Sequence, residues 1–304
     1  MKLSRFATNP DDRHVVFVPG LCDLLREAAQ VPRPIRLLLE RGDGQDLDPA
    51  TCHSRLLFGQ ALPAAALSRC FDRPDDTSGT WLRADPVGLT PDLGAVWLES
   101  QAGLPPDSAA ARELVERFAE EGMRLDLCGS GRGYLALQDE PECRFSPPWQ
   151  LAGESMDRVW PEGPDALYWR HLLNETQMIL HQHRQSNTDL PGSLWFWGAG
   201  SLPAAVVPGR VRGVHATSPE LQGAALWAGL EVVQSCPDAG LSAGALVEWR
   251  PDHALSADDN LARLAELLGA AVRRLRFSRT LRELELAGEH RAWRLSTLRA
   301  WRPW

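Results

Sequence analysis

The chain has 304 residues, of which 40 are acidic, 32 are basic and 44% are apolar. This length accommodates one large domain or two modest ones. The charged fraction of 24% and the mean hydropathy of -0.26 exclude a wholly disordered chain and an integral membrane protein. The net charge of -8 disfavours non-specific binding of nucleic acid by the chain as a whole.

The N-terminus and the cysteines predict a cytoplasmic protein. Residues 1–12 are mostly polar and lack the apolar run of a secretory signal. No stretch approaches the ~18 successive apolar residues that cross a bilayer, so we expect no membrane contact. The six cysteines are scattered without a C-x-x-C pair, so we expect reduced thiols and no zinc site.

The first 78 residues predict one buried strand and several helices. The β-branched run His14–Val18 predicts a buried strand that is closed by a turn at Pro19-Gly20. Prolines and glycines delimit helices, which we expect over Leu24–Gln30, Ile35–Glu40 and, in two pieces broken at Pro63, Ser54–Cys70. The polar stretch Arg41–Pro49 predicts a solvent-exposed loop, and the turn formers of Arg73–Gly79 predict a linker.

Residues 79–163 predict a compact α+β lobe. Four strands are expected, at Trp81–Asp85, Ala95–Leu98, Met123–Leu127 and Tyr134–Leu137. Between the second and the third, Asp107–Gly122 has the pattern of an amphipathic helix, because Ala111, Leu114 and Phe118 recur on one face. The glycine-rich run Cys128–Gly133 is followed by a strand and not by the helix that a phosphate loop requires, so it predicts a hairpin turn.

The remaining residues alternate between helix and strand patterns. Helices are expected over Pro164–Arg184, Pro219–Gly229 and Ala257–Arg274, and strands at Leu194–Trp197, Val211–Ala216, Ala245–Trp249 and in a hairpin over Leu281–Leu295. This alternation predicts an α/β core, in which residues 1–78 and 164–304 form a mainly parallel sheet with flanking helices, and residues 79–163 are a smaller α+β inserted domain. Because Leu194–Trp197 is apolar at four successive positions, we expect it to be a central parallel strand.

Two groups of residues are candidates for binding or for a metal. The long helix holds His171, Glu175, His181 and His183, but these side chains do not converge on one side of it. We therefore expect no metal and no other cofactor. The apolar strand ends in Trp197-Gly198-Ala199-Gly200, where the absence of side chains would let a ligand approach the backbone. A tight turn under packed tryptophans is the alternative.

The weak catalytic candidates are Asp252 and His253. They follow the strand Ala245–Trp249, at the edge of a parallel sheet where ligands bind. The alternative is a loop that leads to the N-cap of the next helix. No G-x-S-x-G sequence, which would mark a serine nucleophile on a strained turn, occurs in the chain.

The C-terminal segment is strongly basic. Residues 270–304 hold nine arginines and three acidic residues, a net charge of +6, which leaves -14 on the rest of the chain. Aromatic residues interleave with the arginines, as on surfaces that bind nucleic acid or an acidic partner. Alternatively, this segment lies against the acidic body of the protein and neutralises it, which is the interpretation that we favour.

Three segments carry a resemblance to a known family. They are Trp81-Leu82-Arg83-Ala84-Asp85-Pro86-Val87, Leu173-Asn174-Glu175-Thr176-Gln177-Met178-Ile179-Leu180-His181 and Ser193-Leu194-Trp195-Phe196-Trp197-Gly198-Ala199-Gly200-Ser201-Leu202-Pro203. In this order and spacing the chain resembles the RpfE-type regulatory proteins of bacteria over most of its length. More remotely, it resembles the cofactor-independent phosphoglycerate mutases of the archaeal type, in the alkaline-phosphatase-like superfamily. The second resemblance implies that residues 79–163 are the inserted domain that those mutases place over their phosphate-transfer site.

Departures from the mutase pattern imply a loss of catalysis. Those mutases have a metal-binding aspartate after the first strand, where this chain has Pro19, and an aspartate-serine nucleophile that is missing here. The late metal ligands survive at most as Asp252 and His253, and two-metal phosphoryl transfer needs both ions. Within the RpfE type, Gly88 replaces a usual histidine and Gly192 a usual asparagine.

Three hypotheses of function follow. The first is a non-catalytic regulatory or binding protein on a degenerate mutase scaffold, which holds an unknown protein partner or a phosphorylated small molecule in a cleft between its domains. The ligand-binding residues expected for it are Arg83, as the main anchor, with Asp85, Asn174, His181, Trp197, Gly198 and Gly200. The second is a mutase-like enzyme that acts on a phosphorylated small molecule through Asp252 and His253. The third is a nucleic-acid accessory protein that uses residues 270–304.

Overall fold

The computed structural model describes residues 13–92, 95–100, 103–150, 160–207, 209–234, 244–277 and 281–300, with the backbone alone for 89–100. The chain divides into two compact units. Unit 1 consists of Met1–Ala61 and Val206–Trp304, and unit 2 consists of Leu62–Ala205. Along the chain, the boundaries between the units are therefore 61/62 and 205/206. The boundaries predicted from the sequence are 78/79 and 163/164.

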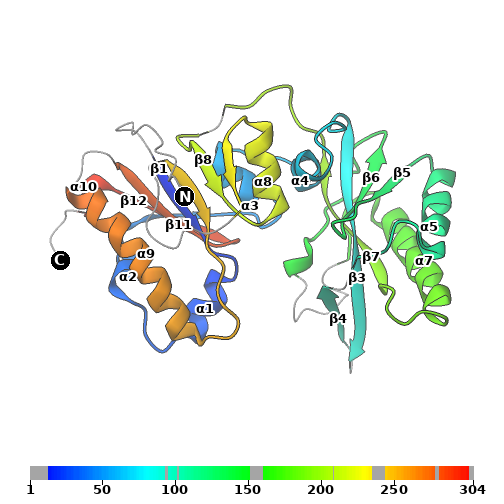
Figure 1. Ribbon diagram of the computed structural model, residues 1–304, viewed down its shortest axis with the longest axis horizontal. Helices are drawn as coiled ribbons and strands as arrows, with labels where there is room; N and C mark the ends of the chain where they lie inside the picture. The colour runs from blue at the N-terminus through cyan, green and yellow to red at the C-terminus, as the bar shows by residue number, and fades with distance from the viewer. Residues whose placement is uncertain are drawn as a thin grey trace. The chain divides into compact units, whose positions relative to one another are not determined.

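Unit 1 is built on a mainly parallel sheet (Figure 1). Of the described strands, seven form it in the order β2-β12-β11-β1-β10-β8-β9. Their bounds are β1 Arg13–Phe17, β2 Asp43–Asp46, β8 Gly213–His215, β9 Glu231–Val233, β10 Ala245–Glu248, β11 Glu283–Ala287 and β12 Arg291–Ser296. The pairs from β11 through β9 are parallel, whereas β12 is antiparallel to β11 and to β2. The predicted α/β core with a mainly parallel sheet is confirmed.

The helices of unit 1 bury apolar stripes against this sheet. They are α1 Leu21–Glu27, α2 Arg33–Arg41, α3 Cys52–Phe58, α8 Pro219–Trp227, α9 Ala257–Phe277 and α10 Thr297–Ala300. On α9, Leu261, Leu264 and Leu268 recur at helical spacing and are fully buried in one cluster with α2, β1 and β11. Each such leucine contributes about 1.5–3 kcal/mol by burial. This packing fixes α9, and with it the loop that joins α9 to β10.

Unit 2 contains the second sheet, which is antiparallel. Its strands are β3 Thr80–Asp92, β4 Ala95–Ser100, β5 Arg124–Leu127, β6 Gly133–Leu137 and β7 Ser193–Gly200, in the order β4-β3-β6-β5, and β7 pairs with β3. Its helices are α4 Ala64–Asp72, α5 Ala109–Glu120 and α7 Ala166–Arg184, with a short 3-10 turn at Pro148–Gln150. A sheet with helices and hairpin connections is the α+β architecture that the sequence predicts for the lobe.

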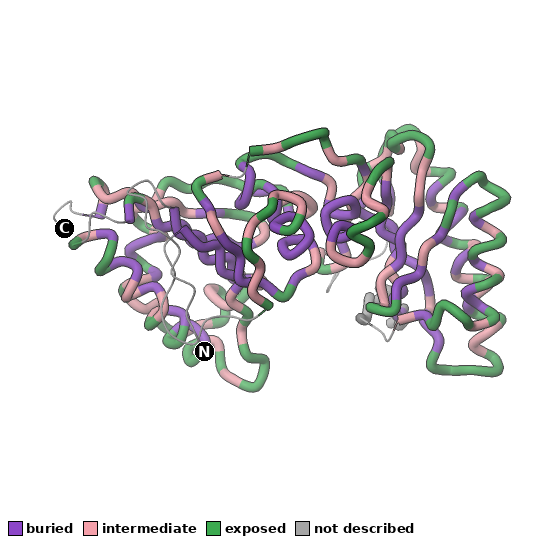
Figure 2. Tube along the Cα trace, turned by 45° about the horizontal axis from the view of Figure 1, so that its top comes forward, coloured by how far each residue is buried: buried purple, intermediate pink, exposed green. Residues whose placement is uncertain are grey.

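Strand β3 sends alternate side chains to the two faces of this sheet. Leu82 and Ala84 belong to the main apolar cluster with α5 and α7, whereas Trp81 packs on the other side, against the alanines of α4. Figure 2 shows that the buried residues of unit 2 follow the strands, while the outer sides of the helices are exposed. Both faces of the sheet are covered, so polar residues of β3 such as Arg83 lie in the interior of unit 2.

Two predictions about strands are wrong. Leu194–Trp197 is fully buried as predicted, but β7 pairs antiparallel with β3 and is no part of the parallel sheet. A continuous apolar run reports burial on both faces and carries no information on strand direction, and here α4 covers one face and α7 the other. The predicted loop Arg41–Pro49 contains the edge strand β2, which pairs with β12 through backbone groups while its side chains stay exposed.

None of the helices in the described ranges combines the length and the apolar composition that a bilayer-spanning segment needs.

Candidate functional site

The carboxyl ends of β1, β8, β10 and β11, called the sheet edge below, are held by the protein's own side chains. After β1 the chain turns at Pro19 and Gly20, where Gly20 has a φ of 73°, open to glycine at little cost. The Gly20 N–H donates a 2.8 Å hydrogen bond to the Oε1 of Glu289, just beyond β11. Proline has no side-chain atom that can bind a metal, so Pro19 supplies no ligand at this turn.

Glu248, the last residue of β10, lies at the centre of the sheet edge with a fully buried side chain. Its Oε2 accepts the N–H of Thr217 at 2.7 Å and that of Ser218 at 2.8 Å, ahead of α8. Its Oε1 pairs with the guanidinium of Arg250 at 2.7 Å. Burial raises the pKa of Glu248, but the Ser218 N–H and Arg250 outweigh burial and hold that pKa below its ordinary value.

The catalytic candidates Asp252 and His253 lie on the loop between β10 and α9. Asp252 accepts the N–H of Ala254 at 3.0 Å, and its own N–H donates to Asn260 at 2.8 Å, so these groups shape the loop. His253 is exposed. These contacts agree with the alternative given above for Asp252 and His253, a loop that leads into the next helix.

The residues of the sheet edge do not fit the two-metal centre that the mutase resemblance implies. Pro19 offers no ligand, and both carboxylate oxygens of Glu248 are already bonded within the chain. Across the part of the chain that the structure describes, no group of three or more His, Cys, Asp or Glu side chains is placed to hold a metal.

The thiols are poor nucleophiles. Burial raises the pKa of Cys70, Cys128 and Cys143 to about 11 and that of Cys52 further still. A reactive cysteine needs a lowered pKa, because the thiolate is the attacking species. No covalent chemistry is therefore assigned to these four side chains.

In unit 2 the structure brings Arg83, Asp85 and Trp197 together as one buried network. The Nη2 of Arg83 lies 2.7 Å from the Oδ2 of Asp85, and that oxygen also accepts the indole N–H of Trp197 at 2.7 Å. The guanidinium of Arg83 bonds Ser68 of α4 at 3.1 Å and lies over the ring of Trp197 at 5.0 Å. With 4% of its side chain exposed, Arg83 joins β3, β7 and α4 in the interior.

The glycines after Trp197 provide room for α4. Gly198 has a φ of 69°, and a Cβ on it would lie 3.0 Å from the Cβ of Ala64. A Cβ on Gly200 would lie 2.9 Å from Pro63. The sequence predicts that a ligand approaches the backbone at these glycines, and in the structure the N-terminus of α4 packs against them.

Helix α7 has two polar sides, and residues on one of them pair with α5. Glu175 lies 2.6 Å from the guanidinium of Arg117, and His183 lies 2.7 Å from Glu113. His171 is 3.5 Å from Glu175. The first two contacts join α7 to α5, whereas the third lies within α7.

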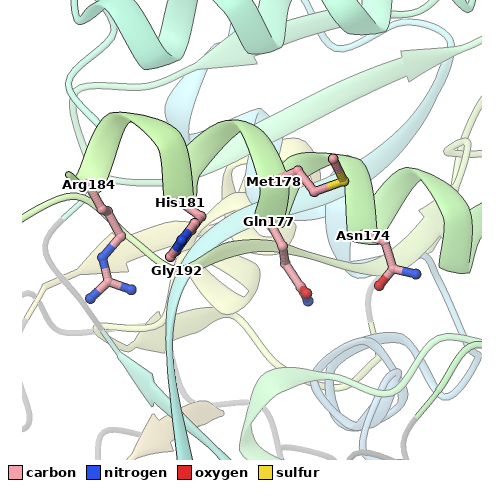
Figure 3. Close-up of a pocket in the computed structure, with 6 residues that line it drawn as sticks. All are labelled: Asn174, Gln177, Met178, His181, Arg184 and Gly192. Carbon is pink, nitrogen blue, oxygen red and sulfur yellow. The ribbon is translucent and has the colours of Figure 1, made fainter.

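The other polar side of α7 faces a cavity of about 470 Å³, called the α7 pocket. Six residues line it: Asn174, Gln177, Met178, His181, Arg184 and Gly192. In Figure 3, the side chains of Asn174, Gln177, His181 and Arg184 all extend to the same side of the helix. Two of the residues expected to bind a ligand, Asn174 and His181, thus line one cavity, whose lining does not include Arg83, Asp85 or Trp197.

Sequence reasoning missed Gln177, Met178 and Arg184. The signal was present, because 174, 177, 181 and 184 are spaced three, four and three residues apart, which puts them on one face of a helix at ~3.6 residues per turn. Buried residues of α7 such as Leu173 and Leu180 occupy a neighbouring face. Gln177 and Met178 lie inside the family-like segment Leu173–His181 but were given no role, and Arg184 lies three residues beyond it.

The arginine-rich segment lies against acidic residues where it is described. Arg294 bonds the buried Glu285 at 2.9 Å, and Arg299 pairs with Asp43 of β2. Arg291 lies 3.5 Å from Asp46 on the same strand. Glu285 belongs to the basic segment itself, whereas the two contacts with β2 join the segment to the acidic rest of the chain, as the neutralising interpretation expects.

Comparisons with known proteins place the chain near one class of enzyme. No family model matches it. The chain is 27% identical over 108 residues to the 2,3-bisphosphoglycerate-independent phosphoglycerate mutase of Methanosarcina mazei, covering 32% of this chain and 27% of that protein. It is 27% identical over 133 residues to a probable enzyme of that name from Geobacter sulfurreducens, covering 40% of this chain and 33% of that protein. The match thus spans about a third or less of these relatives.

Two solved structures align over most of the chain. The cofactor-independent phosphoglycerate mutase of Thermoplasma acidophilum aligns over 94% of this chain and 90% of its own, with 15% identity and a TM-score of 0.37. The PH0037 protein of Pyrococcus horikoshii aligns over 94% and 87%, with 12% identity and a TM-score of 0.47. Taken with the fold, the sequence matches support a remote similarity to cofactor-independent phosphoglycerate mutases.

Proposed function

We propose that the chain is a non-catalytic regulatory or binding protein of the RpfE type on a phosphoglycerate-mutase-like scaffold, and that its ligand site is the α7 pocket. The observation that carries the proposal is a contrast between two places. At the sheet edge, the carboxylates of Glu248 and Glu289 are bonded by N–H groups and an arginine of the chain. In the α7 pocket, the polar side chains have no partner within the described residues.

The sheet edge is unsuited to phosphate for an energetic reason. The N–H groups ahead of a helix form a natural anion site, but at α8 the carboxylate of Glu248 already occupies it. A phosphate that displaced this carboxylate would accept the same N–H groups but would leave the buried Glu248 with only Arg250 as a partner, so the exchange adds a second negative charge without adding a hydrogen bond.

The proposal includes a cytoplasmic location. All five cysteines in the described part of the chain are free thiols, which agrees with a reducing compartment. Their raised pKa values keep those that are buried protonated and inert at neutral pH.

Metal content tests the proposal. We expect the whole chain, purified without chelators and equilibrated with Mn²⁺ or Zn²⁺, to retain less than one equivalent of metal after gel filtration. Two retained equivalents, measured by plasma mass spectrometry and lost on treatment with a chelator, would contradict it. The Glu248→Gln variant is the control, since binding that disappears with this substitution locates the metal at the sheet edge.

The second candidate is a phosphoglycerate-mutase-like enzyme that acts on a phosphorylated small molecule. The similarity of 27% over 108 and 133 residues to proteins of that name favours it. This function would need catalytic groups other than Asp252, because that side chain shapes its own loop.

A further inference from the structure

The α7 pocket has the size of a small-molecule site. Its volume of about 470 Å³ lies within the range of roughly 300–1,000 Å³ that is usual for small ligands. Asn174 and Arg184 are ten residues apart on α7, so the lining extends over ~15 Å at 1.5 Å per residue. A ligand of more than one functional group is therefore needed to contact both ends.

The polar groups of the pocket are available for a ligand. Asn174, Gln177, His181 and Arg184 make no hydrogen bond or ion pair with any residue that the structure describes. On the opposite side of the same helix, Glu175 and His183 are both paired with α5. The difference within one helix indicates that the pocket side is not a saturated structural surface.

The charge of the lining selects an anion. Among the described residues that line the pocket are a guanidinium and an imidazole, and none of these described residues is a carboxylate. Arg184 is the last residue of α7, where the helix dipole disfavours an anion by up to about fivefold in affinity. A charge-assisted hydrogen bond from a guanidinium contributes about ten- to a hundredfold, so the arginine outweighs the dipole.

The other side chains of the pocket indicate which groups the rest of the ligand carries. The amides of Asn174 and Gln177 can each donate and accept hydrogen bonds, which suits hydroxyl or amide groups. Met178 is 63% exposed and offers an adaptable apolar surface beside them.

We infer that the α7 pocket binds a small oxyanion, with the carboxylate or phosphate group at Arg184 and His181 and a hydrogen-bonding body along Gln177 and Asn174. This inference rests on the proposed function, because it takes the α7 pocket as the ligand site and names the class of ligand bound there. A volume of about 470 Å³ matches a small molecule, and an acidic peptide is the alternative ligand that the pocket would have to reject.

The test is a titration of the whole chain with inorganic phosphate and, separately, with succinate, at one pH and constant ionic strength. The reporter is the imidazole carbon resonance of His181, which the His181→Gln variant assigns. We expect a saturable shift of this resonance with one or both anions and none for His171, which lies on the paired side of α7. A response to phosphate alone identifies a phosphate ester, and a response to succinate alone identifies a carboxylate.

Arg184→Ala is the decisive variant, and we expect it to weaken the titration about tenfold or more. Arg36→Ala removes an exposed arginine from α2, in unit 1, and should titrate like the wild type. Arg184→Lys should restore part of the affinity, because it keeps the charge but loses the bidentate geometry.

Two results would overturn the inference: no shift of His181 with either anion, or an unchanged affinity of Arg184→Ala. The metal test of the proposed function is independent. Two retained metal ions together with an intact anion titration would remove the proposed function and leave the anion pocket standing.

Discussion

Replacing Arg83 tests whether this residue is part of the interior of unit 2. The Arg83→Met variant keeps the volume of the side-chain stem and removes the guanidinium. Asp85 would then retain only the indole N–H of Trp197, with 13% of its side chain exposed. Removing one partner of a buried ion pair costs about 3–5 kcal/mol. Because Asp85 keeps one hydrogen bond and some access to water, we expect about 3 kcal/mol.

The assay is equilibrium unfolding in urea, followed by tryptophan fluorescence and circular dichroism. Two units can unfold separately, so the transitions need assignment. Leu268→Ala, in the fully buried core of unit 1, should move only the transition of unit 1, by about 2–5 kcal/mol. Arg83→Met should move the other transition.

Two further variants make the result specific. Arg73→Met removes an arginine that also pairs with a carboxylate, Asp126, but is 43% exposed, and it should cost less than about 1 kcal/mol. Adding Asp85→Asn to Arg83→Met should recover about 1–2 kcal/mol, since it removes the unpaired charge. If Arg83→Met costs no more than Arg73→Met, the buried network does not stabilise unit 2 and the reasoning fails.

Two other predictions concern Gly198 and Glu248. Gly198→Ala should cost about 2 kcal/mol of unit 2 stability in the same assay, because φ is 69° and the new Cβ meets Ala64 at 3.0 Å. The control is Gly122→Ala, which has a φ of 73° but only a 3.6 Å contact and should cost about half as much. Equal losses of stability in the two variants would contradict the packing argument. Glu248→Gln should cost unit 1 about 2–3 kcal/mol at neutral pH. The pKa of Glu248 is lowered in the folded state, so its contribution is complete above the ordinary value of 4.5 and is lost as the pH falls through the lower folded value. The gap between wild type and Glu248→Gln in urea midpoints should therefore close in acid, and a gap that is independent of pH would count against the assigned hydrogen bonds.

Elements with a local signal were predictable from the sequence. Helix α5 follows from the period of Ala111, Leu114 and Phe118, and it begins at the capping Ser108, whose hydroxyl accepts the N–H of Ala111. It ends before Gly122, which has the positive φ typical of that position. The hairpin of β5 and β6 follows from its glycine-rich turn. In each case a few neighbouring residues determine the conformation.

Features that depend on distant residues were not predictable. Strand β7 is apolar throughout, but its partner β3 lies more than a hundred residues earlier in the chain, and the pattern of β7 does not identify that partner. The role of Arg83 depends likewise on Trp197 and on α4, which only the fold brings to it. The polar side of α7 was visible in the spacing, but only the fold shows that its side chains find no partner among the described residues.

The most direct test of the central claim is whether the whole chain interconverts phosphoglycerates. The measurement is ³¹P NMR of 3-phosphoglycerate with the purified protein and an excess of Mn²⁺, Co²⁺ or Mg²⁺. The account predicts no 2-phosphoglycerate above the level of a protein-free sample. Conversion that scales with protein concentration and stops on removal of the metal would contradict it.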